Sequence, residues 1–495
     1  MKMLNFLCLL LLFSKKFAII VIVQIQFGDE INMTKAEKFF EDIKNKKISF
    51  IGTGVTNNDV IRLFLKKGFD VTVCDKKSRQ DMGALADEFE KSGAKLSNGE
   101  NYLDPIFESD IVFRAPGVYY NIPEIQKARS MGVTVTSEME VFFDLCPCKI
   151  YAITGTDGKT TTTTITSEML ARSGKTVHKG GNIGRALLPI IEDIKEDDVA
   201  VVELSSFQLI SMRRSPDNAA ITNIYPDHLN VHKSMQEYIG AKKNLILHQN
   251  AFSRTVLNMD NEETNKLSEF VRGDLYKFSV KNKPERGSFL DGDGWLCFTE
   301  KRVTERIVHK DEIRIPGMHN VENYLTAISL IHGDVPNKAV AETAREFGGV
   351  EHRIEFVREL DGVKYYNDSI ATSPVSVIAG LNAFEKRLIV IAGGSDKQLD
   401  YSLLAEPINS RVKVLVLLGA TADKIEAAVK AYPKYDGENC RIIRVNTMEE
   451  AVEAARKSAE TGDIVTLSPA SASFDMYKNF EERGKHYKGI VNAMS

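Results

Sequence analysis

A glycine-rich loop with a lysine and several threonines carries the clearest chemical signal in the chain. Residues 150–154 are an apolar run that predicts a short strand, and Gly155-Thr156-Asp157-Gly158-Lys159-Thr160-Thr161 follows it directly. The backbone N–H groups of such a loop, with the N-terminus of a following helix, can hold nucleotide phosphates. We expect Lys159 to reach the β- and γ-phosphates and the Thr160 hydroxyl to bind Mg²⁺. The alternative is a plain turn with an exposed lysine.

Charged side chains after two later apolar runs indicate a metal-binding region beside this loop. VAVVEL (199–204) places Glu203 at the end of a predicted buried strand, where a carboxylate can bind Mg²⁺. NAAITNI (218–224) places Asp227 and His228 at the end of another predicted strand. A lone histidine usually has a structural role, but in this position we expect His228 to be a ligand. Oxygen ligands with one imidazole suit Mg²⁺ or Mn²⁺ better than a structural zinc ion.

A second glycine loop lies nearer the N-terminus and is close to a dinucleotide-binding fingerprint. Gly52-Thr53-Gly54-Val55-Thr56-Asn57 matches G-x-G-x-x-G except at its last position, and Asp75 follows after about 20 residues. The missing third glycine normally allows close packing of helix on strand. Lys76 and Lys77 suit an anionic ligand. Three interpretations stay open: an NAD site, a site for another phosphorylated nucleotide, which we favour, and a structural tight turn.

The elements that must position these groups alternate between apolar runs and helical stretches, which predicts parallel sheets covered by helices. We predict an α/β fold of three domains. Residues 34–148 form a Rossmann-like domain, residues 149–348 a P-loop ATPase-type domain with a parallel or mixed sheet, and residues 349–495 a second Rossmann-like domain. Ligands of such sheets bind at the carboxyl ends of the strands, where all of these loops lie.

Length and composition agree with this organisation. A chain of 495 residues suggests about three domains, since domains average roughly 150 residues. The net charge of −4 leaves no basic excess to hold a polyanion, so we expect no nucleic-acid partner. Six cysteines are too sparse for a disulfide framework, and Cys146-Pro147-Cys148 is not a CxxC motif. Reduced thiols indicate a cytoplasmic protein.

Residues 1–33 do not match the rest of the sequence. Two apolar runs, 4–13 and 17–25, are separated by Ser14-Lys15-Lys16, and neither reaches the roughly 20 residues that span a bilayer. We favour a true translation start at Met33, with the preceding residues an artefact of gene prediction. The alternatives are a weak membrane anchor and a secretory signal, although no small-residue cleavage site follows. We expect no stable membrane insertion.

Several further motifs make the chain similar to the Mur ligase family from about residue 45 to 490. They are TGTDGKTTTT (154–163), GGNIG (180–184), VELSSFQL (202–209), DHLNVH (227–232), YIGAKK (238–243), GMHNVENYLTA (317–327), EHRIE (351–355), YNDSIATSP (366–374) and SPASASFDMYKNFEERG (468–484). The resemblance implies an ATP-dependent amide ligase of peptidoglycan precursor synthesis. GGNIG, ELSSFQL and the C-terminal motif most resemble members that add D-glutamate to UDP-N-acetylmuramoyl-L-alanine (UDP-MurNAc-L-Ala).

The resemblance also implies a mechanism. ATP converts the substrate's terminal carboxylate into an acyl phosphate, and the amine of D-glutamate displaces phosphate from it. Lys159, Glu203, His228 and Lys242 are the implied catalytic residues. Lys242 is implied to be a carbamate that serves a second Mg²⁺ with His228, whereas Thr160 and Glu203 hold the first. Lys243, the adjacent lysine, is the alternative to Lys242, and an isolated surface lysine is the ordinary interpretation of either.

The remaining implied contacts divide among the three substrates. ATP is implied to contact Asn320, Asn323, Arg353 and Asp368; the UDP substrate Val55, Thr56, Asp75, Lys76, Pro116, Gly117 and Asn182; and D-glutamate Thr372, Lys397, Ser473 and Phe474.

Three positions depart from the family pattern. Asp157 stands where many members carry Asn, Ile370 where Lys is usual, and Ser373-Pro374 also differ. Lys397 can compensate for the missing cation at position 370.

Other functions are less consistent with the sequence. A sibling Mur ligase would add a different amino acid, and a diamino acid would need an anionic pocket. Folylpolyglutamate synthetase lacks the first domain, and a dehydrogenase does not need the second loop. A non-catalytic nucleotide-binding or membrane-tethered scaffold is the alternative from another class. We expect a monomer whose partners are ATP, D-glutamate and UDP-MurNAc-L-Ala.

Overall fold

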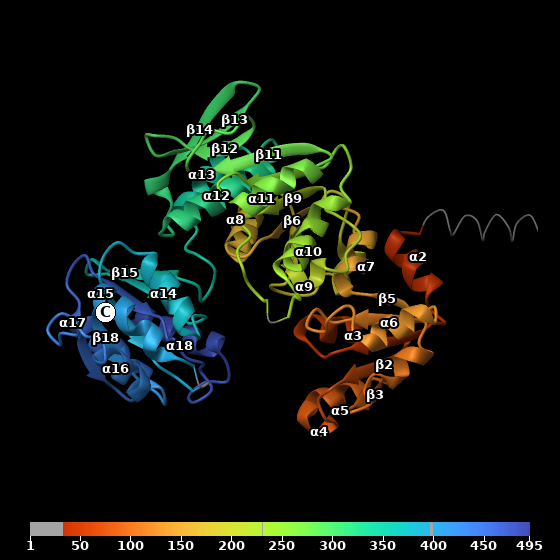
Figure 1. The fold of residues 1–495 in the computed structure, drawn as a ribbon, viewed down its shortest axis with the longest axis horizontal. Helices are drawn as coiled ribbons and strands as arrows, with labels where there is room; N and C mark the ends of the chain where they lie inside the picture. Colours follow the sequence, from red (N-terminus) through yellow and green to blue (C-terminus); the bar gives the residue numbers. More distant parts are fainter. Residues whose placement is uncertain (1–32, 230, 397–398) are drawn as a thin grey trace, which may run out of the picture. The chain divides into compact units, whose positions relative to one another are not determined.

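A computed structural model of the protein describes residues 33–229, 231–396 and 399–495 (Figure 1). These residues form three β-sheets. The chain divides into two units. The first contains the described residues up to Asp157 together with Gly174–Leu257 and Asn261–Leu275, and the second contains Gly158–Ser173, Asn258–Asp260 and Tyr276–Ser495. The three interpretations of the N-terminal stretch fall on residues outside the described part, apart from Met33, and stay predictions. So do the domain boundaries near 148 and 348.

The first sheet is parallel, in the order β3-β2-β1-β4-β5, as predicted for a Rossmann-like domain. Stacked Phe50 and Phe113, with ring centres 4.9 Å apart, form part of its core. Its strands are β1 (Lys47–Ile51), β2 (Asp70–Asp75), β3 (Lys95–Asn98), β4 (Ile111–Arg114) and β5 (Thr134–Thr136). Its helices are α2 (Lys35–Asp42), α3 (Val55–Lys66), α4 (Arg79–Met82), α5 (Ala84–Lys91), η1 (Asp104–Glu108), α6 (Pro123–Ser130) and α7 (Glu138–Leu145).

The second sheet has the order β14-β13-β12-β11-β10-β9-β6-β8-β7. Strands β10, β9, β6, β8 and β7, in this order along the sheet, pair in parallel. Strands β12, β13 and β14 pair antiparallel. The predicted mixed sheet is therefore confirmed. Its strands are β6 (Lys149–Thr154), β7 (Val177–Gly181), β8 (Val199–Glu203), β9 (Asn218–Ile221), β10 (Arg254–Asn258), β11 (Asp274–Ser279), β12 (Gly287–Leu290), β13 (Trp295–Glu300) and β14 (Val303–His309). Its helices are α8 (Lys159–Arg172), η2 (Leu188–Asp193), α9 (Ser206–Leu209), α10 (Met235–Leu247), α11 (Glu262–Lys266), η3 (Leu267–Phe270), η4 (Lys310–Glu312), α12 (Met318–Ile331) and α13 (Asn337–Glu346).

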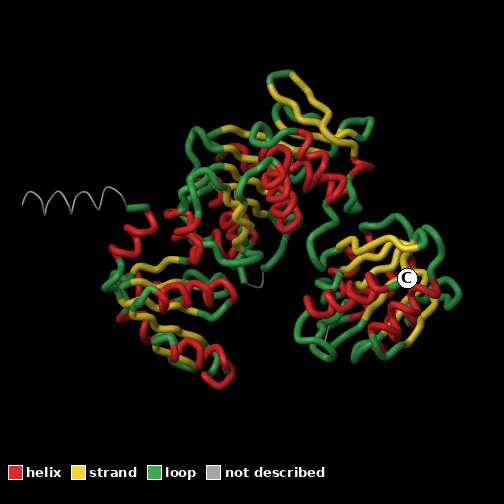
Figure 2. Tube along the Cα trace, turned by 180° about the vertical axis from the view of Figure 1, so that it is seen from behind, coloured by secondary structure: helices red, strands yellow, loops and turns green. Residues whose placement is uncertain are grey.

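The third sheet has the order β15-β16-β20-β17-β18-β19, and only β15 runs antiparallel to its neighbour. Alternate residues of β17 belong to two separate apolar clusters, so helices cover both faces (Figure 2). This confirms the second Rossmann-like domain. Its strands are β15 (Glu355–Leu360), β16 (Val363–Asn367), β17 (Leu388–Ala392), β18 (Val412–Leu417), β19 (Arg441–Arg444) and β20 (Ile464–Leu467). Its helices are α14 (Pro374–Asn382), η5 (Tyr401–Leu404), α15 (Ala405–Arg411), α16 (Ala422–Lys430), α17 (Met448–Ser458) and α18 (Phe480–Ala493).

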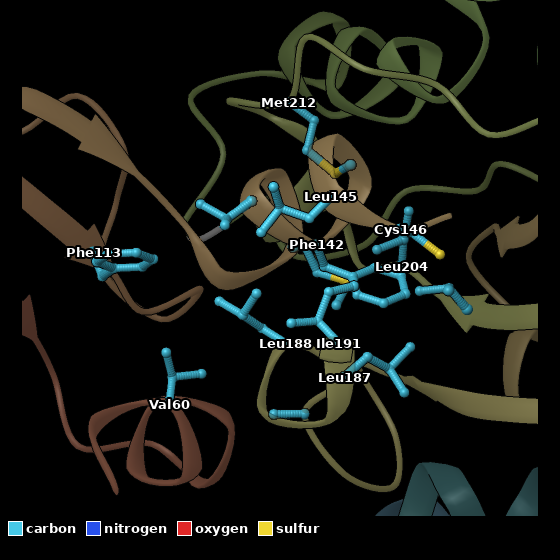
Figure 3. Close-up of a cluster of buried hydrophobic side chains, with 14 of the residues drawn as sticks. Val60, Phe113, Phe142, Leu145, Cys146, Leu187, Leu188, Ile191, Leu204 and Met212 are labelled. Carbon is cyan, nitrogen blue, oxygen red and sulfur yellow. The ribbon is translucent and has the colours of Figure 1, made fainter. Parts of the chain in front are cut away.

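Helix α7 packs into the largest apolar cluster, beside residues that position the candidate site. Phe142 and Leu145 of this helix lie near Leu187, Leu188 and other buried side chains of the cluster (Figure 3). In the described ranges, no helix combines the length and apolar character needed to cross a membrane.

Candidate active site

The loop from Gly155 to Thr160 follows β6 and requires glycine at two positions. Gly155 and Gly158 have φ values of 153° and 79°, and a Cβ on Gly155 would lie 1.8 Å from Thr222 Oγ1. Gly158 precedes α8, and a Cβ there would lie 2.3 Å from Asn323 Oδ1. No side chain caps α8. A helix N-terminus of this kind is suited to hold phosphate.

Two residues after β9 hold the phosphate loop in place, and the sequence motifs did not single them out. Asn223 Oδ1 accepts a hydrogen bond from Asp157 N at 2.9 Å, and Thr222 Oγ1 donates to Asp157 O at 2.6 Å. Thr156 N donates to Asn223 O at 2.9 Å. The sequence feature that could have indicated these two residues is their position, as a Thr-Asn pair, directly after the apolar strand. Asp157 therefore uses its backbone to anchor the loop.

Glu203 ends β8 and is almost completely buried. Its Oε1 accepts a hydrogen bond from Asn182 Nδ2 at 2.8 Å, whereas its buried Oε2 has no hydrogen-bond partner among the described residues. A buried carboxylate oxygen without a partner is costly unless a cation meets it. Among the described residues, no group of three or more His, Cys, Asp or Glu could hold a metal ion. One carboxylate with hydroxyl and phosphate oxygens is nevertheless a donor set that fits Mg²⁺.

The two adjacent lysines of α10 have different surroundings. Lys242 is 2% exposed, and its Nζ donates to Gly155 O at 2.6 Å while lying 4.6 Å from the centre of the Tyr238 ring. Lys243 Nζ lies 4.1 Å from the centre of the Phe270 ring. Lys242 is therefore the lysine that contacts the phosphate loop, and the ordinary interpretation as a surface lysine is wrong for it.

His228 lies in a loop and not at the end of the strand, so that prediction was wrong. Strand β9 ends at Ile221, and residues 222–227 separate it from His228. The His228 backbone has a φ of 53°, and its half-exposed side chain pairs with the Asp227 carboxylate at 3.3 Å.

A second histidine of the same motif is buried. His232 Nε2 pairs with Ser206 Oγ at 2.9 Å, and its ring stacks on Phe207 at 5.2 Å with an interplanar angle of 6°. Burial lowers the pKa of His232, which favours the neutral ring. The only sequence feature that could have indicated this buried, hydrogen-bonded histidine was its position in the DHLNVH motif.

The first glycine loop is held by Asp75, the last residue of β2. Thr53 donates to Asp75 Oδ2 through both its backbone N–H and its hydroxyl, and Lys77 N donates to Oδ1. Burial alone would raise the pKa of Asp75, but these hydrogen bonds hold it below its usual value. Asn57 Nδ2 donates to the carbonyls of Ile51 and Gly52, which explains the residue in place of the third glycine. Of the other predicted UDP contacts, Val55 and Thr56 begin α3 and Lys76 is exposed.

Arg114 shapes the Pro116-Gly117 loop, and the sequence motifs did not indicate it. Its buried guanidinium donates to the carbonyls of Ala115, Pro116 and Val118, the last at 2.6 Å. It also donates to Phe207 O in α9 at 3.1 Å. Burial lowers the pKa of Arg114 to about 10, so the side chain stays charged at neutral pH. This residue links the loop after β4 to the segment after Glu203.

The two asparagines of α12 lie on one face, as their spacing predicted. Asn323 Nδ2 donates to Asn320 Oδ1 at 3.1 Å, and Thr162 Oγ1 donates to Asn323 Oδ1 at 3.2 Å. Both asparagines are buried. The structure therefore joins this pair to α8, the helix of the phosphate loop.

Asp368 follows β16 and is buried beside Arg353. Ser468 Oγ donates to its Oδ2 at 2.9 Å, and Ile354 N donates to its Oδ1 at 3.3 Å. Burial raises the pKa of Asp368 to about 7, although the hydrogen bonds and Arg353 oppose this shift. Arg353 itself is exposed.

Arg483 is a buried arginine that belongs to the C-terminal motif but was not singled out as a site residue. Arg483 donates to Ser369 Oγ and O at 3.0 and 2.9 Å, and to the carbonyls of Ser471 and Ala472, both at 3.1 Å. It thus joins the segment that contains Ile370 and Thr372 to the one that contains Ser473 and Phe474. Ser473 is buried and Phe474 is exposed, whereas Lys397 lies outside the described residues.

Comparisons with known proteins cover almost all of the described chain. Residues 46–137 match the family described as "Mur ligase MurD-like, N-terminal domain", residues 153–331 "Mur ligase middle domain", and residues 352–471 "Mur ligase, glutamate ligase domain". The chain is 47% identical over 463 residues to UDP-N-acetylmuramoylalanine–D-glutamate ligase of Acetivibrio thermocellus, which covers 93% of this chain and 99% of that relative. It is 46% identical over 458 residues to the enzyme of the same name from Clostridium kluyveri, with 92% and 99% covered.

Solved structures show the same fold at low sequence identity. The alanine ligase MurC from Thermotoga maritima has a TM-score of 0.55 and 20% identity, and covers 91% of this chain and 100% of its own. MurF from Acinetobacter baumannii has a TM-score of 0.53 and 16% identity, with 72% and 82% covered.

Proposed function

The chain belongs to the Mur ligase family, and from this membership we infer that it adds D-glutamate to UDP-MurNAc-L-Ala at the expense of ATP. The reaction is a step of peptidoglycan synthesis. The relatives that share 45–47% identity with it over nearly their whole length are named for this activity. The observation that carries the catalytic part is the buried, unpartnered oxygen of Glu203.

The phosphate loop and its helix hold the triphosphate in this proposal. The loop amides and Lys159 bind the phosphates, and Thr160 and Glu203 would hold Mg²⁺. When bound, Mg²⁺ offsets negative charge on the transferring phosphoryl group. Asn320 and Asn323 contact the adenine side of ATP and Asp368 the ribose, whereas Arg353 lies near the phosphates.

The chemistry proceeds in two transfers. A carboxylate oxygen of the L-alanyl group attacks the γ-phosphorus, the bond to the ADP oxygen breaks, and an acyl phosphate forms. The amine of D-glutamate then attacks the acyl carbon, loses a proton, and expels inorganic phosphate as the amide forms. Alignment of these groups and neutralisation of their charge are the main contributions of the protein.

We propose that Lys242 acts as a carbamate. The neutral amine adds to carbon dioxide, a new N–C bond forms, and a proton leaves, which converts a buried cation into an anion. Its burial and its contact with Gly155 O support this assignment. The carbamate and His228 would hold a second Mg²⁺, and Mn²⁺ could replace either ion.

The other substrates are bound by the terminal domains. Thr372, Lys397, Ser473 and Phe474 bind D-glutamate, because a dicarboxylate needs cations and hydroxyl or backbone donors. The UDP substrate contacts Val55, Thr56, Asp75, Lys76, Pro116, Gly117 and Asn182. We further propose that the enzyme works in the cytoplasm as a monomer, on these three small-molecule substrates.

Phosphate release by the purified protein with ATP, Mg²⁺ and UDP-MurNAc-L-Ala, across a panel of amino acids, tests the function. We expect release with D-glutamate and none with L-alanine or a diamino acid. Release only with another amino acid would assign a sibling activity, and no release with any would favour the non-catalytic scaffold. Lys159→Ala is the control and should release none.

A further inference from the structure

We propose that Glu138 is a positioning residue for this ligase, which sets the orientation of Glu203 through Leu187 and the GGNIG segment. Glu138 contacts no substrate in this account. The proposal rests on the proposed function for its kinetic test, but not for its structural one.

Glu138 is the first residue of α7 and is 3% exposed. Its Oε1 accepts hydrogen bonds from Leu187 N and Leu188 N, both at 3.0 Å, and its Oε2 has no hydrogen-bond partner in the part of the chain that the structure describes. Leu187 and Leu188 lie where η2 begins, inside the apolar cluster of α7 (Figure 3). Burial of a carboxyl among apolar side chains is costly. An apolar residue would avoid this cost, so the specific contribution of Glu138 is the pair of backbone hydrogen bonds.

The next contact passes from Leu187 to the glycines of β7. A Cβ on Gly180 would lie 2.7 and 2.9 Å from the Leu187 side chain and 2.6 Å from Arg185 O. A Cβ on Gly181 would lie 2.2 Å from Glu203 O. The two glycines therefore lie between the Leu187 side chain and the backbone of Glu203, and neither position has room for a side chain. A shift of Leu187 must move this segment.

The last contact reaches the carboxylate itself. Asn182 donates twice to Glu203, from its backbone N to Glu203 O and from Nδ2 to Oε1, each at 2.8 Å. The second hydrogen bond leaves Oε2 as the oxygen directed to a cation. Residues that orient a metal ligand in this way typically change metal affinity by about 10- to 100-fold when they are altered.

The test compares Glu138→Leu with Glu138→Gln, which keeps one acceptor oxygen. Leu145→Ala is the matched control, because Leu145 is buried on the same helix but its apolar side chain can accept no hydrogen bond from Leu187 N or Leu188 N. We expect Glu138→Leu to raise the Mg²⁺ concentration for half-maximal rate by about tenfold or more. The KM for D-glutamate should stay unchanged, and Glu138→Gln should stay within about threefold of wild type. Leu145→Ala should lower the melting temperature without altering the Mg²⁺ dependence.

A second readout does not depend on activity. Amide hydrogen exchange of the protein without Mg²⁺ or ATP should become faster across residues 180–188 in Glu138→Leu, and not in Leu145→Ala. Unchanged exchange and unchanged Mg²⁺ dependence in a folded Glu138→Leu protein would overturn the proposal, as would equal changes in both variants. If Glu138→Leu does not fold, Gly180→Ala displaces Leu187 from the segment and must raise the Mg²⁺ requirement. An inactive wild-type protein would contradict the proposed function, and the exchange result would still decide the role of Glu138.

Discussion

Asn182 Nδ2 donates to Glu203 Oε1 at 2.8 Å, and the second carboxylate oxygen is buried without a hydrogen-bond partner in the described ranges. The arrangement separates two requirements of a metal ligand. One oxygen fixes the direction of the carboxylate, and the other stays available for the ion.

Glu203→Gln removes the negative charge but keeps the shape of the side chain. We expect kcat to fall at least about a hundredfold, because loss of one electrostatic partner of the transition state costs on the order of 3 kcal/mol. The free energy of unfolding without ATP should be unchanged or higher, because the variant no longer buries a charged carboxylate oxygen. Kinetics at saturating Mg²⁺ and thermal unfolding of the free protein provide the two measurements. A destabilised variant with normal kcat would contradict this role.

Lys242→Ala and Lys243→Ala distinguish the two neighbouring lysines. Lys242→Ala should abolish phosphate release, and added short carboxylates should partly restore it by replacing the carbamate. Lys243 lies against Phe270 and not at the phosphate loop, so Lys243→Ala should keep most of the activity. The reverse pattern would show that the carbamate has been assigned to the wrong lysine.

Arg114→Lys tests the loop that includes Pro116 and Gly117. Lysine cannot reproduce the fork of hydrogen bonds to Ala115, Pro116 and Val118, and each carbonyl left unsatisfied costs about 1–3 kcal/mol. We expect a lower free energy of unfolding and a higher KM for UDP-MurNAc-L-Ala, with the KM for D-glutamate unchanged. Steady-state kinetics with each substrate varied in turn measures this. An equal rise in both KM values would argue for general disorder.

Asp368 predicts a pH dependence of stability. Its folded pKa of about 7 lies above the usual value of about 4, so between these pH values the folded protein keeps a proton that the unfolded chain has lost. The contribution of the Asp368 proton to the free energy of unfolding is therefore fully present below about pH 4 and is lost as the pH rises through about 7. The full shift corresponds to at most about 4 kcal/mol. In urea unfolding, the free energy of unfolding of Asp368→Asn relative to wild type should be higher at pH 8 than at pH 5. The same difference between the two proteins at both pH values would refute the raised pKa of Asp368.

The sequence was most informative where chemistry follows an apolar strand. Both glycine loops and Glu203 lie at strand ends, because a parallel sheet places its ligand-binding loops there. His228 was misplaced because the strand before it ends at Ile221, and propensity alone does not locate such an end. The family motif distinguished Lys242 from Lys243, but local sequence properties could not. The burial of each lysine depends on packing against other helices.

The residues that support the site were not predictable. Arg114, Glu138 and Arg483 are charged side chains that the fold buries, and each has a partner far along the chain: Phe207 O for Arg114, Leu187 N for Glu138 and Ser369 for Arg483. Glu138 and Leu187 are separated by 49 positions, and no periodicity connects them. Such contacts depend on the three-dimensional path of the backbone and not on residue type, so local patterns carry no record of them.

The most direct test of the central claim is mass spectrometry of the product formed from ATP, UDP-MurNAc-L-Ala and D-glutamate. We expect a product heavier than the substrate by one glutamate residue, with one ADP formed for each amide bond. No such product should form when D-glutamate is omitted. Absence of this product, or a product that appears only with a different amino acid, would contradict the assignment.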